Sequence, residues 1–591
     1  MRTPVSGSLP LAGVSRRAFL GGLPLLLASR SVRAGETKTR AAHVSPNAAS
    51  TVNVSVCHIG YRTASTKRAV ISTTGPGTSQ EFQLLSGSLP IRSAVLQPVN
   101  FGSGYAYVWD FSDLTTPGTY QCVTNGGSSV TFAIGDSVWL NNLSTVFKYH
   151  TAQRCGTAVA GVHTACHLDD ARRRDTGQTV SATGGWHDAG DLRKWVDATL
   201  MNLFGILAIA RNLGAQWNPA GLTPLLNEAK WGNAYFLKMQ DVDGLIWADT
   251  AGGVNGDNSD NHWTDNTPGT ADDRWINTSK NSNVQAMFIA AEAMMNQTFA
   301  TVDGLYASKC LDAAVRCWGA ADHNSSNTTD LGWWLLAAVE MYRATGQSQY
   351  SDEIVRLANT ISGVQFKDYV QGQQFTRGFF PQWPGNSTPL VDPVYSGIPC
   401  FALLQAAEAM PGQADATGWR DAVSMYLDDY VAPMTSLSAY RALPYGIFIG
   451  SPTADIYRPL GGNLTYRFFM PAKSIFLGLT SHLLSHALLL GEAAKFFGRT
   501  DYRNLAYAQL EWVFGVNPFN STLATGLGYR NPAAFSPFVG PIRGGIMNGI
   551  CGDVNDNPVL PMQNAAYWPS NEYWSPHVGF CEWALSVLAS D

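Results

Sequence analysis

Charge is scarce in this chain of 591 residues. Only 14% of the residues are charged, against roughly 25% in an average soluble protein, and 39 Lys and Arg stand against 44 Asp and Glu. The formal net charge of −5 excludes nucleic-acid binding that rests on bulk positive charge. Long apolar runs are missing too. No internal segment reaches the roughly 18 residues that a membrane span needs, so we expect no span.

Apolar and aromatic residues are plentiful instead. Hydrophobic residues make up 45% of the chain and aromatic residues 11%, with 18 Trp, 57 Gly and 30 Pro. Such a chain can bury a large core and is not disordered. Its length predicts two to four domains. Little charge together with many Gly, Trp and Asn favours an exported protein that handles neutral substrates.

The N-terminus has the pattern of an export signal. Two arginines, Arg16 and Arg17, precede an apolar run over Leu20–Ala28 that is too short to span a bilayer. The pair resembles a twin-arginine signal, and a standard secretory signal with a chance arginine pair is the alternative. We expect residues 1–45 to be signal peptide and disordered leader, cut near Ala34. The mature protein is then periplasmic or secreted.

The cysteine count points away from a disulfide framework. Nine cysteines are an odd number, so at least one lies outside any intramolecular disulfide. A twin-arginine substrate folds in the cytoplasm, where thiols start reduced. We therefore expect some cysteines to be metal ligands or core residues.

The apolar pattern changes period once along the chain. From about Thr51 to Ile134, alternating apolar residues are separated by Gly- and Pro-rich turns, which predicts a small antiparallel β-sandwich over residues 50–136. Beyond Trp139, apolar residues recur at helical spacing. One core rarely grows to 450 residues, so a ring of helical hairpins is expected, with its long loops gathered at one end to carry the site.

The most informative stretch is Gly-Gly-Trp-His-Asp-Ala-Gly-Asp at residues 184–191. Its two carboxylates, Asp188 and Asp191, are three residues apart in a Gly-rich turn before a helix. In one pocket they can share a water, one accepting its proton while the other holds it. The alternative is that Asp191 only caps the following helix.

This stretch resembles the signature of glycoside hydrolase family 9, the inverting β-glucanases. Residues 57–61 and 110–120 resemble the immunoglobulin-like module that precedes some of these catalytic domains, and residues 230–241 and 337–346 resemble family helices. Asn571-Glu572 matches the pair that carries the family's catalytic acid. The resemblance implies a mainly α chain: an (α/α)6 barrel over residues 139–591 behind a small all-β immunoglobulin-like sandwich.

The resemblance also implies three catalytic roles. Asp191 would be the general base on the attacking water, Asp188 would position that water, and Glu572 would be the general acid on the leaving oxygen. Inversion requires the acid and base roughly 6.5–9.5 Å apart, with room for water between them. Two alternatives stay open: Glu572 as a surface-loop residue, and Glu582 as a competing carboxylate.

A metal site is expected beside the base. Two thiols and two imidazoles, Cys155, Cys166, His167 and His187, make a closed tetrahedral set suited to structural Zn²⁺. They resemble the zinc site of a subset of family 9 enzymes that carry the immunoglobulin-like module. Since His187 directly precedes Asp188, zinc would hold the acidic turn. The alternative is a Cys155–Cys166 disulfide.

Calcium is a second candidate metal. Two Asp-rich loops offer the oxygen ligands that Ca²⁺ prefers, one at Asp241–Gly244 and one at Asp257–Asp273. In the second loop the candidates are Asp260, Asp265, Asp272 and Asp273. The alternative is that both loops are ordinary solvated turns.

Sugar binding requires aromatic rings in loops, because sugars present apolar ring faces. The candidates are Trp263, Trp275, Trp383 and Trp568, with Arg530 as a polar partner. For each tryptophan a place in the core is the alternative.

One segment departs from the family pattern. Where many family 9 cellulases carry a His-His-Arg-like segment, this chain has Ala533–Pro537 and no histidine pair. We expect an endoglucanase-like enzyme that cleaves β-1,4-linked glucan, acts as a monomer, and has β-linked oligo- or polysaccharides as its partners. The open alternatives are an exo-acting β-glucosidase or exo-β-glucosaminidase, and a catalytically weak carbohydrate-binding protein.

Overall fold

The structure is a computed structural model. It describes residues 52–75, 77–101, 104–217, 221–370, 372–473, 475 and 477–590. The predicted export signal, residues 1–45, lies outside the described residues.

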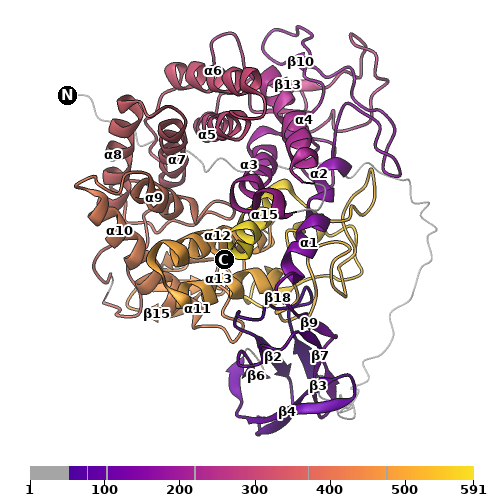
Figure 1. The fold of residues 1–591 in the computed structure, drawn as a ribbon, viewed down its shortest axis with the longest axis vertical. Helices are drawn as coiled ribbons and strands as arrows, with labels where there is room; N and C mark the ends of the chain where they lie inside the picture. The colour runs from indigo at the N-terminus through magenta and orange to yellow at the C-terminus, as the bar shows by residue number, and fades with distance from the viewer. Residues whose placement is uncertain are drawn as a thin grey trace, which may run out of the picture.

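The N-terminal part is a sandwich of two antiparallel sheets, lowest in Figure 1. One sheet has the order β1-β2-β6-β5 and the other β4-β3-β7-β8, with β9 paired to β7. Val54 and Val56 point inward and are buried, as the alternating pattern predicts. The strands are β1 (Val52–Ser55), β2 (Arg68–Thr73), β3 (Gln80–Ser86), β4 (Leu89–Leu96), β5 (Val99–Phe101), β6 (Gly104–Asp110), β7 (Gly118–Thr124), β8 (Gly127–Ser128) and β9 (Phe132–Ile134).

The rest of the chain forms a closed ring of helices, visible in Figure 1. Six inner helices each contact the next around the ring. They are α3 (Val196–Leu213), α5 (Ser282–Phe299), α7 (Thr328–Thr345), α9 (Ile398–Ala409), α12 (Thr480–Phe497) and α15 (Ser575–Ala589). Outer helices cover them, namely α1 (Val138–Val146), α2 (Lys148–Ala152), α4 (Thr223–Met239), α6 (Gly304–Ala320), α8 (Ser348–Gly363), α10 (Ala416–Met425) and α13 (Thr500–Val513). Each inner helix has an outer neighbour, which makes six hairpins and confirms the predicted barrel.

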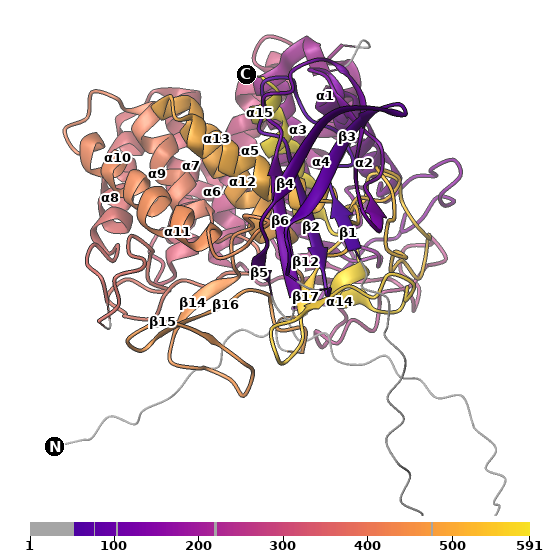
Figure 2. The ribbon, with the colours of Figure 1, turned by 90° about the horizontal axis from the view of Figure 1, so that it is seen from below.

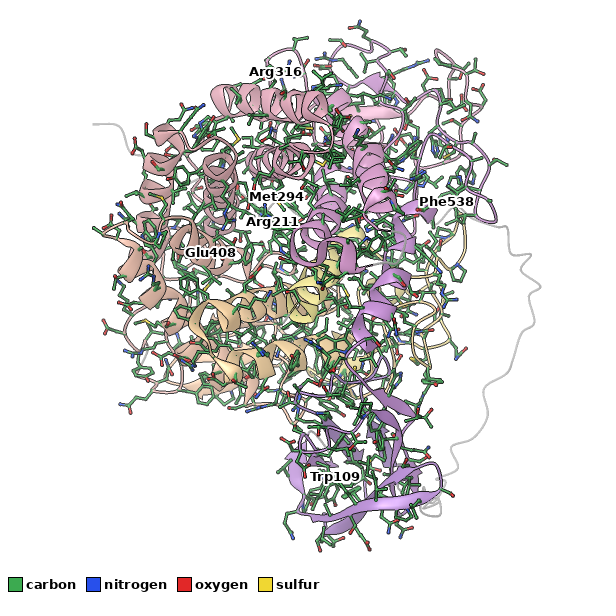
Figure 3. All side chains as sticks on the ribbon, in the orientation of Figure 1. Trp109, Arg211, Met294, Arg316, Glu408 and Phe538 are labelled. Atoms are coloured by element: carbon green, nitrogen blue, oxygen red, sulfur yellow. The ribbon has the colours of Figure 1, made fainter. Side chains whose placement is uncertain are left out.

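Burial explains which helices lie inside. Along outer helix α8 the buried residues Tyr350, Ile354, Leu357 and Ile361 form a single stripe. Inner helix α3 is buried on nearly every face. Together with the 3₁₀ turn η1 (Gly214–Trp217), it is long and apolar enough to cross a membrane, but 72% of its most apolar window is buried inside the ring. Side chains from the helices project into the ring (Figure 3).

Short strands and loops gather at one end of the ring (Figure 2). One small sheet has the order β10-β13-β12-β11 and another β14-β16-β15. The remaining elements are β10 (Arg172–Arg173), β11 (Lys194–Trp195), β12 (Asp249–Thr250), β13 (Trp275–Asn277), η2 (Tyr426–Val431), α11 (Ala432–Thr435), β14 (Gly446–Ile449), β15 (Arg458–Gly461), β16 (Leu464–Arg467), β17 (Cys551–Gly552), β18 (Pro558–Val559) and α14 (Trp568–Asn571). The inner helices begin at this end.

Candidate active site

The acidic turn is shaped by its glycines and its tryptophan. Gly185 has a φ of +74°, and a Cβ there would come within 2.7 Å of the Tyr235 ring. Trp186 is fully buried against Gly232, where a Cβ would clash with the indole, and donates from Nε1 to Glu228 at 2.9 Å. These contacts restrict the backbone conformation of the turn.

Both aspartates of the turn are buried and held by hydrogen bonds. Asp188 accepts from the Trp574 indole at 2.9 Å and from the Trp195 backbone N–H at 3.3 Å. Asp191 is 7% exposed and accepts from the Arg193 N–H at 3.2 Å. Because helix α3 begins at Val196 with Trp195 at its N-cap position, Asp191 is not its cap.

Glu572 lies on a segment that runs directly against this turn. It follows α14, is 3% exposed, and is therefore not a surface residue. Two residues on, Trp574 pairs with Ala189, and the Ser575 N–H donates to the Asp188 carbonyl at 2.7 Å. The chain thus ties together two segments that lie about 380 residues apart.

The Tyr573 hydroxyl lies near the carboxylates of both Glu572 and Asp191. Burial raises the pKa of Tyr573, and the charges of both Glu572 and Asp191 raise it further. Glu582, by contrast, is fully buried on α15 and pairs with His150 at 2.8 Å. Glu582 is therefore engaged inside the ring, whereas Glu572 lines the cavity.

The segment that departs from the family pattern also packs on the turn. A Cβ at Gly190 would come within 2.3 Å of the Phe535 carbonyl oxygen, so only glycine allows this approach. Ser536 and the Tyr573 hydroxyl lie 2.6 Å apart. Ala533–Pro537 therefore forms part of the wall beside the carboxylates.

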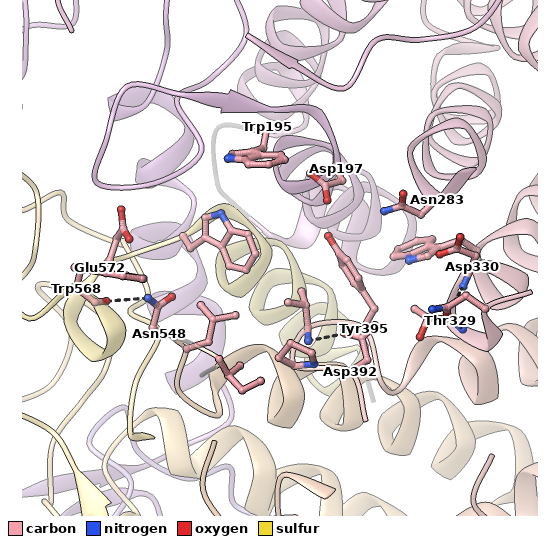
Figure 4. A pocket seen from close by; sticks show the side chains of 17 residues that line it. Trp195, Asp197, Asn283, Thr329, Asp330, Asp392, Tyr395, Asn548, Trp568 and Glu572 are labelled. Carbon is pink, nitrogen blue, oxygen red and sulfur yellow. Dashed lines mark hydrogen bonds between the residues drawn. The ribbon is translucent and has the colours of Figure 1, made fainter. Parts of the chain in front are cut away.

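A cavity of about 410 Å³ opens next to Glu572, at the ends from which the inner helices begin. Its lining includes Trp568, one of the predicted sugar-binding residues, together with other aromatic, aliphatic, amide and carboxylate side chains. In the part of the chain that the structure describes, no Lys, Arg or His lines it. Figure 4 shows Glu572 and Trp568 at one end and Thr329 and Asp330 at the other.

The other predicted sugar-binding residues lie outside this cavity. Trp263 stacks on His167 with a centroid distance of 5.6 Å, and Trp275 carries the Arg172 guanidinium 6.0 Å from its ring. Trp383 sits in the loop before α9, and Arg530 is exposed. Their part in sugar binding stays a prediction.

The four candidate metal ligands come together as predicted. Cys155, Cys166, His167 and His187 are buried, and their ligand atoms all lie within 4.8 Å of one another. Nδ1 of His167 is 3.4 Å from Cys155 Sγ and 3.4 Å from His187 Nε2. Tetrahedral zinc places neighbouring ligand atoms roughly 3.3–3.8 Å apart, so the set fits zinc.

The chemistry of the four groups also fits a metal. All nine cysteines are free thiols, which removes the disulfide alternative. A hydrogen bond with Cys155 lowers the pKa of Cys166 to about 5, and burial lowers the pKa of His187 to about 4. A thiolate and a neutral imidazole are the forms that bind zinc.

A buried ion pair lies beneath the turn and the Cys/His cluster. Asp170 receives both Arg274 and Lys194 at 2.6 Å, and all three side chains are fully buried. Burial opposes ionisation of Asp170, but the two cations hold its pKa well below its usual range. Arg274 also reaches Cys155 Sγ at 3.8 Å, so the pair supports the cluster directly.

Both acidic loops contain ion pairs, and in the second loop Asp273 binds Arg172 at 3.1 Å. Asp241 and Asp243 form ion pairs with Lys280. Asp272 and Asp273 lie with Asp169 in a cluster whose carboxylate oxygens are within 4.8 Å of one another. One oxygen of Asp169, which is 1% exposed, has no hydrogen-bond partner. Asp260, which accepts backbone N–H groups from Gly253 and Trp275, and Asp265 lie outside that cluster.

Sequence reasoning missed most of the cavity lining. Asp197, Asp330, Asp392 and Tyr395 all line it, and each lies at or just before the start of an inner helix. Aspartate in a first helical turn is common in any helix, because it favours the helix dipole. Only the closed ring of helices shows that these four residues line the same cavity.

Comparisons with known proteins agree with this architecture. The family model described as Glycosyl hydrolase family 9 matches residues 140–535, and the model described as Cellulase N-terminal ig-like domain matches residues 49–129. Endoglucanase D of Acetivibrio thermocellus is 24% identical over 465 residues, which are 72% of this chain and 65% of that protein. The chain thus spans less than two thirds of this relative's length.

Two further matches cover more of the other protein. Cellodextrinase of Butyrivibrio fibrisolvens is 22% identical over 467 residues, 72% of this chain and 76% of the relative. The crystal structure of a metagenome-derived glycoside hydrolase family 9 endoglucanase aligns with a TM-score of 0.67 and 22% identity. That alignment covers 91% of this chain and 99% of the other, so the whole two-part fold is shared.

Proposed function

The chain belongs to glycosyl hydrolase family 9, and from this premise we propose that it is an exported, inverting hydrolase that cleaves β-1,4-linked glucan chains. The observation that carries the proposal is the tie between Trp574 and Asp188. Their 2.9 Å hydrogen bond fixes the Glu572 segment against the acidic turn, beside a cavity large enough for a sugar.

Each carboxylate has one task in the proposed reaction. Glu572 donates a proton to the glycosidic oxygen as the C1–O bond breaks. A water attacks C1 from the opposite face, and Asp191 accepts its proton. Asp188, fixed by Trp574 and Trp195, positions the water, so the products gain one water in total and C1 inverts.

The Cys/His cluster is proposed to hold one structural Zn²⁺. Cys155, Cys166, His167 and His187 would use all four coordination positions, which leaves none for substrate. When bound, the ion would cross-link three loop segments. Since His187 is next to Asp188, this chain's own ligands would fix the turn that carries the catalytic carboxylates.

The cluster of Asp169, Asp272 and Asp273 is proposed as a Ca²⁺ site. Its three carboxylates, which include the unpartnered oxygen of Asp169, are ligands of the kind that Ca²⁺ prefers. Export through the twin-arginine-type leader is proposed as well, and it would let the folded protein take up zinc before it leaves the cytoplasm. A monomer is the proposed state.

The test is a substrate panel: carboxymethylcellulose, mixed-linkage β-glucan and cello-oligosaccharides. Wild type is compared with Glu572→Gln and Asp191→Asn, and with the exposed control Glu408→Gln. We expect wild type and control to cleave a β-1,4-glucan, and both active-site variants to lose about three or more orders of magnitude in kcat. Full activity in either variant would remove its residue from the mechanism.

A further inference from the structure

The end of the cavity away from Glu572 carries three carboxylates, which we call the distal acids: Asp197, Asp330 and Asp392. They come from the start of α3, the first turn of α7 and the segment before α9. Among the described residues, none of the three forms an ion pair with a Lys or Arg side chain. Arg193, whose charge acts on Asp197, is itself paired with Asp249 at 3.0 Å and lies on the Trp195 ring.

The described residues donate only a few hydrogen bonds to these three carboxylates. Asp392 accepts two backbone N–H groups at 2.8 Å, and Asp197 accepts one. Within the part of the chain that the structure describes, Asp330 accepts one hydrogen bond, from the Ser325 hydroxyl at 3.2 Å, and Asn327 supplies the cap of α7. Helix dipoles at this end of the ring contribute at most a modest stabilisation of each negative charge.

Burial raises the pKa values of all three distal acids. It raises the pKa of Asp197 and of Asp330 to about 6, and it raises the pKa of Asp392 as well. The charge of Asp392 raises the pKa of Asp330 further. A half-buried carboxylate that is in no ion pair favours a positively charged ligand, because the ligand's charge compensates that of the carboxylate.

Two polar groups in the cavity beside the distal acids have no hydrogen-bond partner among the described residues. The Tyr395 hydroxyl is buried, 8% exposed as a residue, and points toward Asp197 in Figure 4. The indole N–H of Trp333, fully buried, is likewise unpartnered and lines the cavity. Unpaired buried groups are costly, so a ligand that pairs with them gains affinity.

Resting on the proposed function, we propose that this cavity selects an amino sugar, a β-1,4-linked 2-amino-2-deoxy unit with a free, protonated amine. The ammonium binds among Asp197, Asp330 and Asp392. The Tyr395 hydroxyl and the Trp333 indole bind sugar oxygens, and Trp195 and Trp574 offer ring faces for stacking. A neutral glucan fits the same space but leaves the three carboxylates without a cation.

The test measures kcat/KM on three tetramers: β-1,4-linked glucosamine, N-acetylglucosamine and glucose. We expect wild type to prefer the glucosamine tetramer over cellotetraose by roughly 10–100-fold, as charge-assisted hydrogen bonds allow. Acetylation removes the charge and should abolish that preference. Asp330→Asn and Asp392→Asn should each reduce the preference ratio at least about 10-fold.

A matched control separates charge in the cavity from buried charge elsewhere. Glu292→Gln alters a fully buried glutamate of α5, whose pKa burial raises to about 8 and which does not line the cavity, so the ratio should not move. Cleavage of cellotetraose without a preference for glucosamine would overturn the inference and leave the proposed function intact.

If wild type cleaves none of the tetramers, the proposed function fails. The preference for an amino sugar is then tested by measuring binding affinity. Calorimetry with Glu572→Gln should then show the glucosamine tetramer binding at least about 10-fold more tightly than cellotetraose, and less tightly as salt rises. Equal binding of the two tetramers would overturn the inference.

Discussion

Asp170, which is buried, and the distal acids, which are half-buried, have opposite electrostatic surroundings. Asp170 lies under the acidic turn with two cations at 2.6 Å, and its pKa is held low. The distal acids Asp197, Asp330 and Asp392 have no such partner, and burial raises their pKa values. Asp170 is compensated by the fold and stabilises the structure. The distal acids line a cavity, and we propose that a bound cation compensates them.

The largest expected effect breaks the compensated group. Asp170→Asn leaves Arg274 and Lys194 buried with no carboxylate, which should cost about 3–5 kcal/mol of folding free energy. Thermal unfolding should show a clear drop in Tm, and activity should fall with it because the acidic turn lies directly above. An unchanged Tm would show that the two cations find other partners.

The next effect concerns the metal that this ion pair supports. Cys166→Ala should lower the zinc content from about one ion per chain to nearly none, since three ligands hold zinc far less tightly. Tm should fall, and a chelator should bring wild type to the same value. Cys310→Ala, a buried thiol on α6 outside the cluster, is the control for zinc content. Zinc retained by the Cys166 variant would contradict the ligand set.

A smaller effect distinguishes the uncompensated group. Burial raises the pKa of folded Asp330 to about 6, so its contribution to stability is present below pH 4 and is lost as pH rises through 6. Asp330→Asn removes this loss. Relative to wild type, the variant should gain up to roughly 3 kcal/mol between pH 4.5 and 7.5, by chemical denaturation. A gain toward low pH instead would mean that a cation already pairs with Asp330.

The smallest effect tests how the turn is tied to Glu572. Trp574→Phe removes the indole N–H that Asp188 accepts and keeps an aromatic wall. Hydrogen bonds to charged groups are worth about 1.5–3 kcal/mol, so kcat should fall roughly 10–100-fold. If KM alone rose, Trp574 would act only as a wall of the cavity.

The local features of this molecule could be predicted from the sequence. The residues that the fold brings together from distant segments could not. Alternation at Val54 and Val56 predicted the sandwich, and the spacing of Asp188, Asp191 and His187 marked the turn, because these patterns are short-range. The distal acids could not be predicted, since aspartate near a helix start has an ordinary local explanation. Nor could the place of Trp263, whose loop folds back over His167 instead of into the cavity.

The stereochemistry of the first product tests the central claim most directly. Proton NMR of a fresh reaction, on a β-linked oligosaccharide that wild type cleaves, shows which anomer forms before mutarotation. A water held between Asp191 and the sugar predicts the α-anomer first. Appearance of the β-anomer first would mean retention and would contradict the assignment of Asp191 as base and Glu572 as acid.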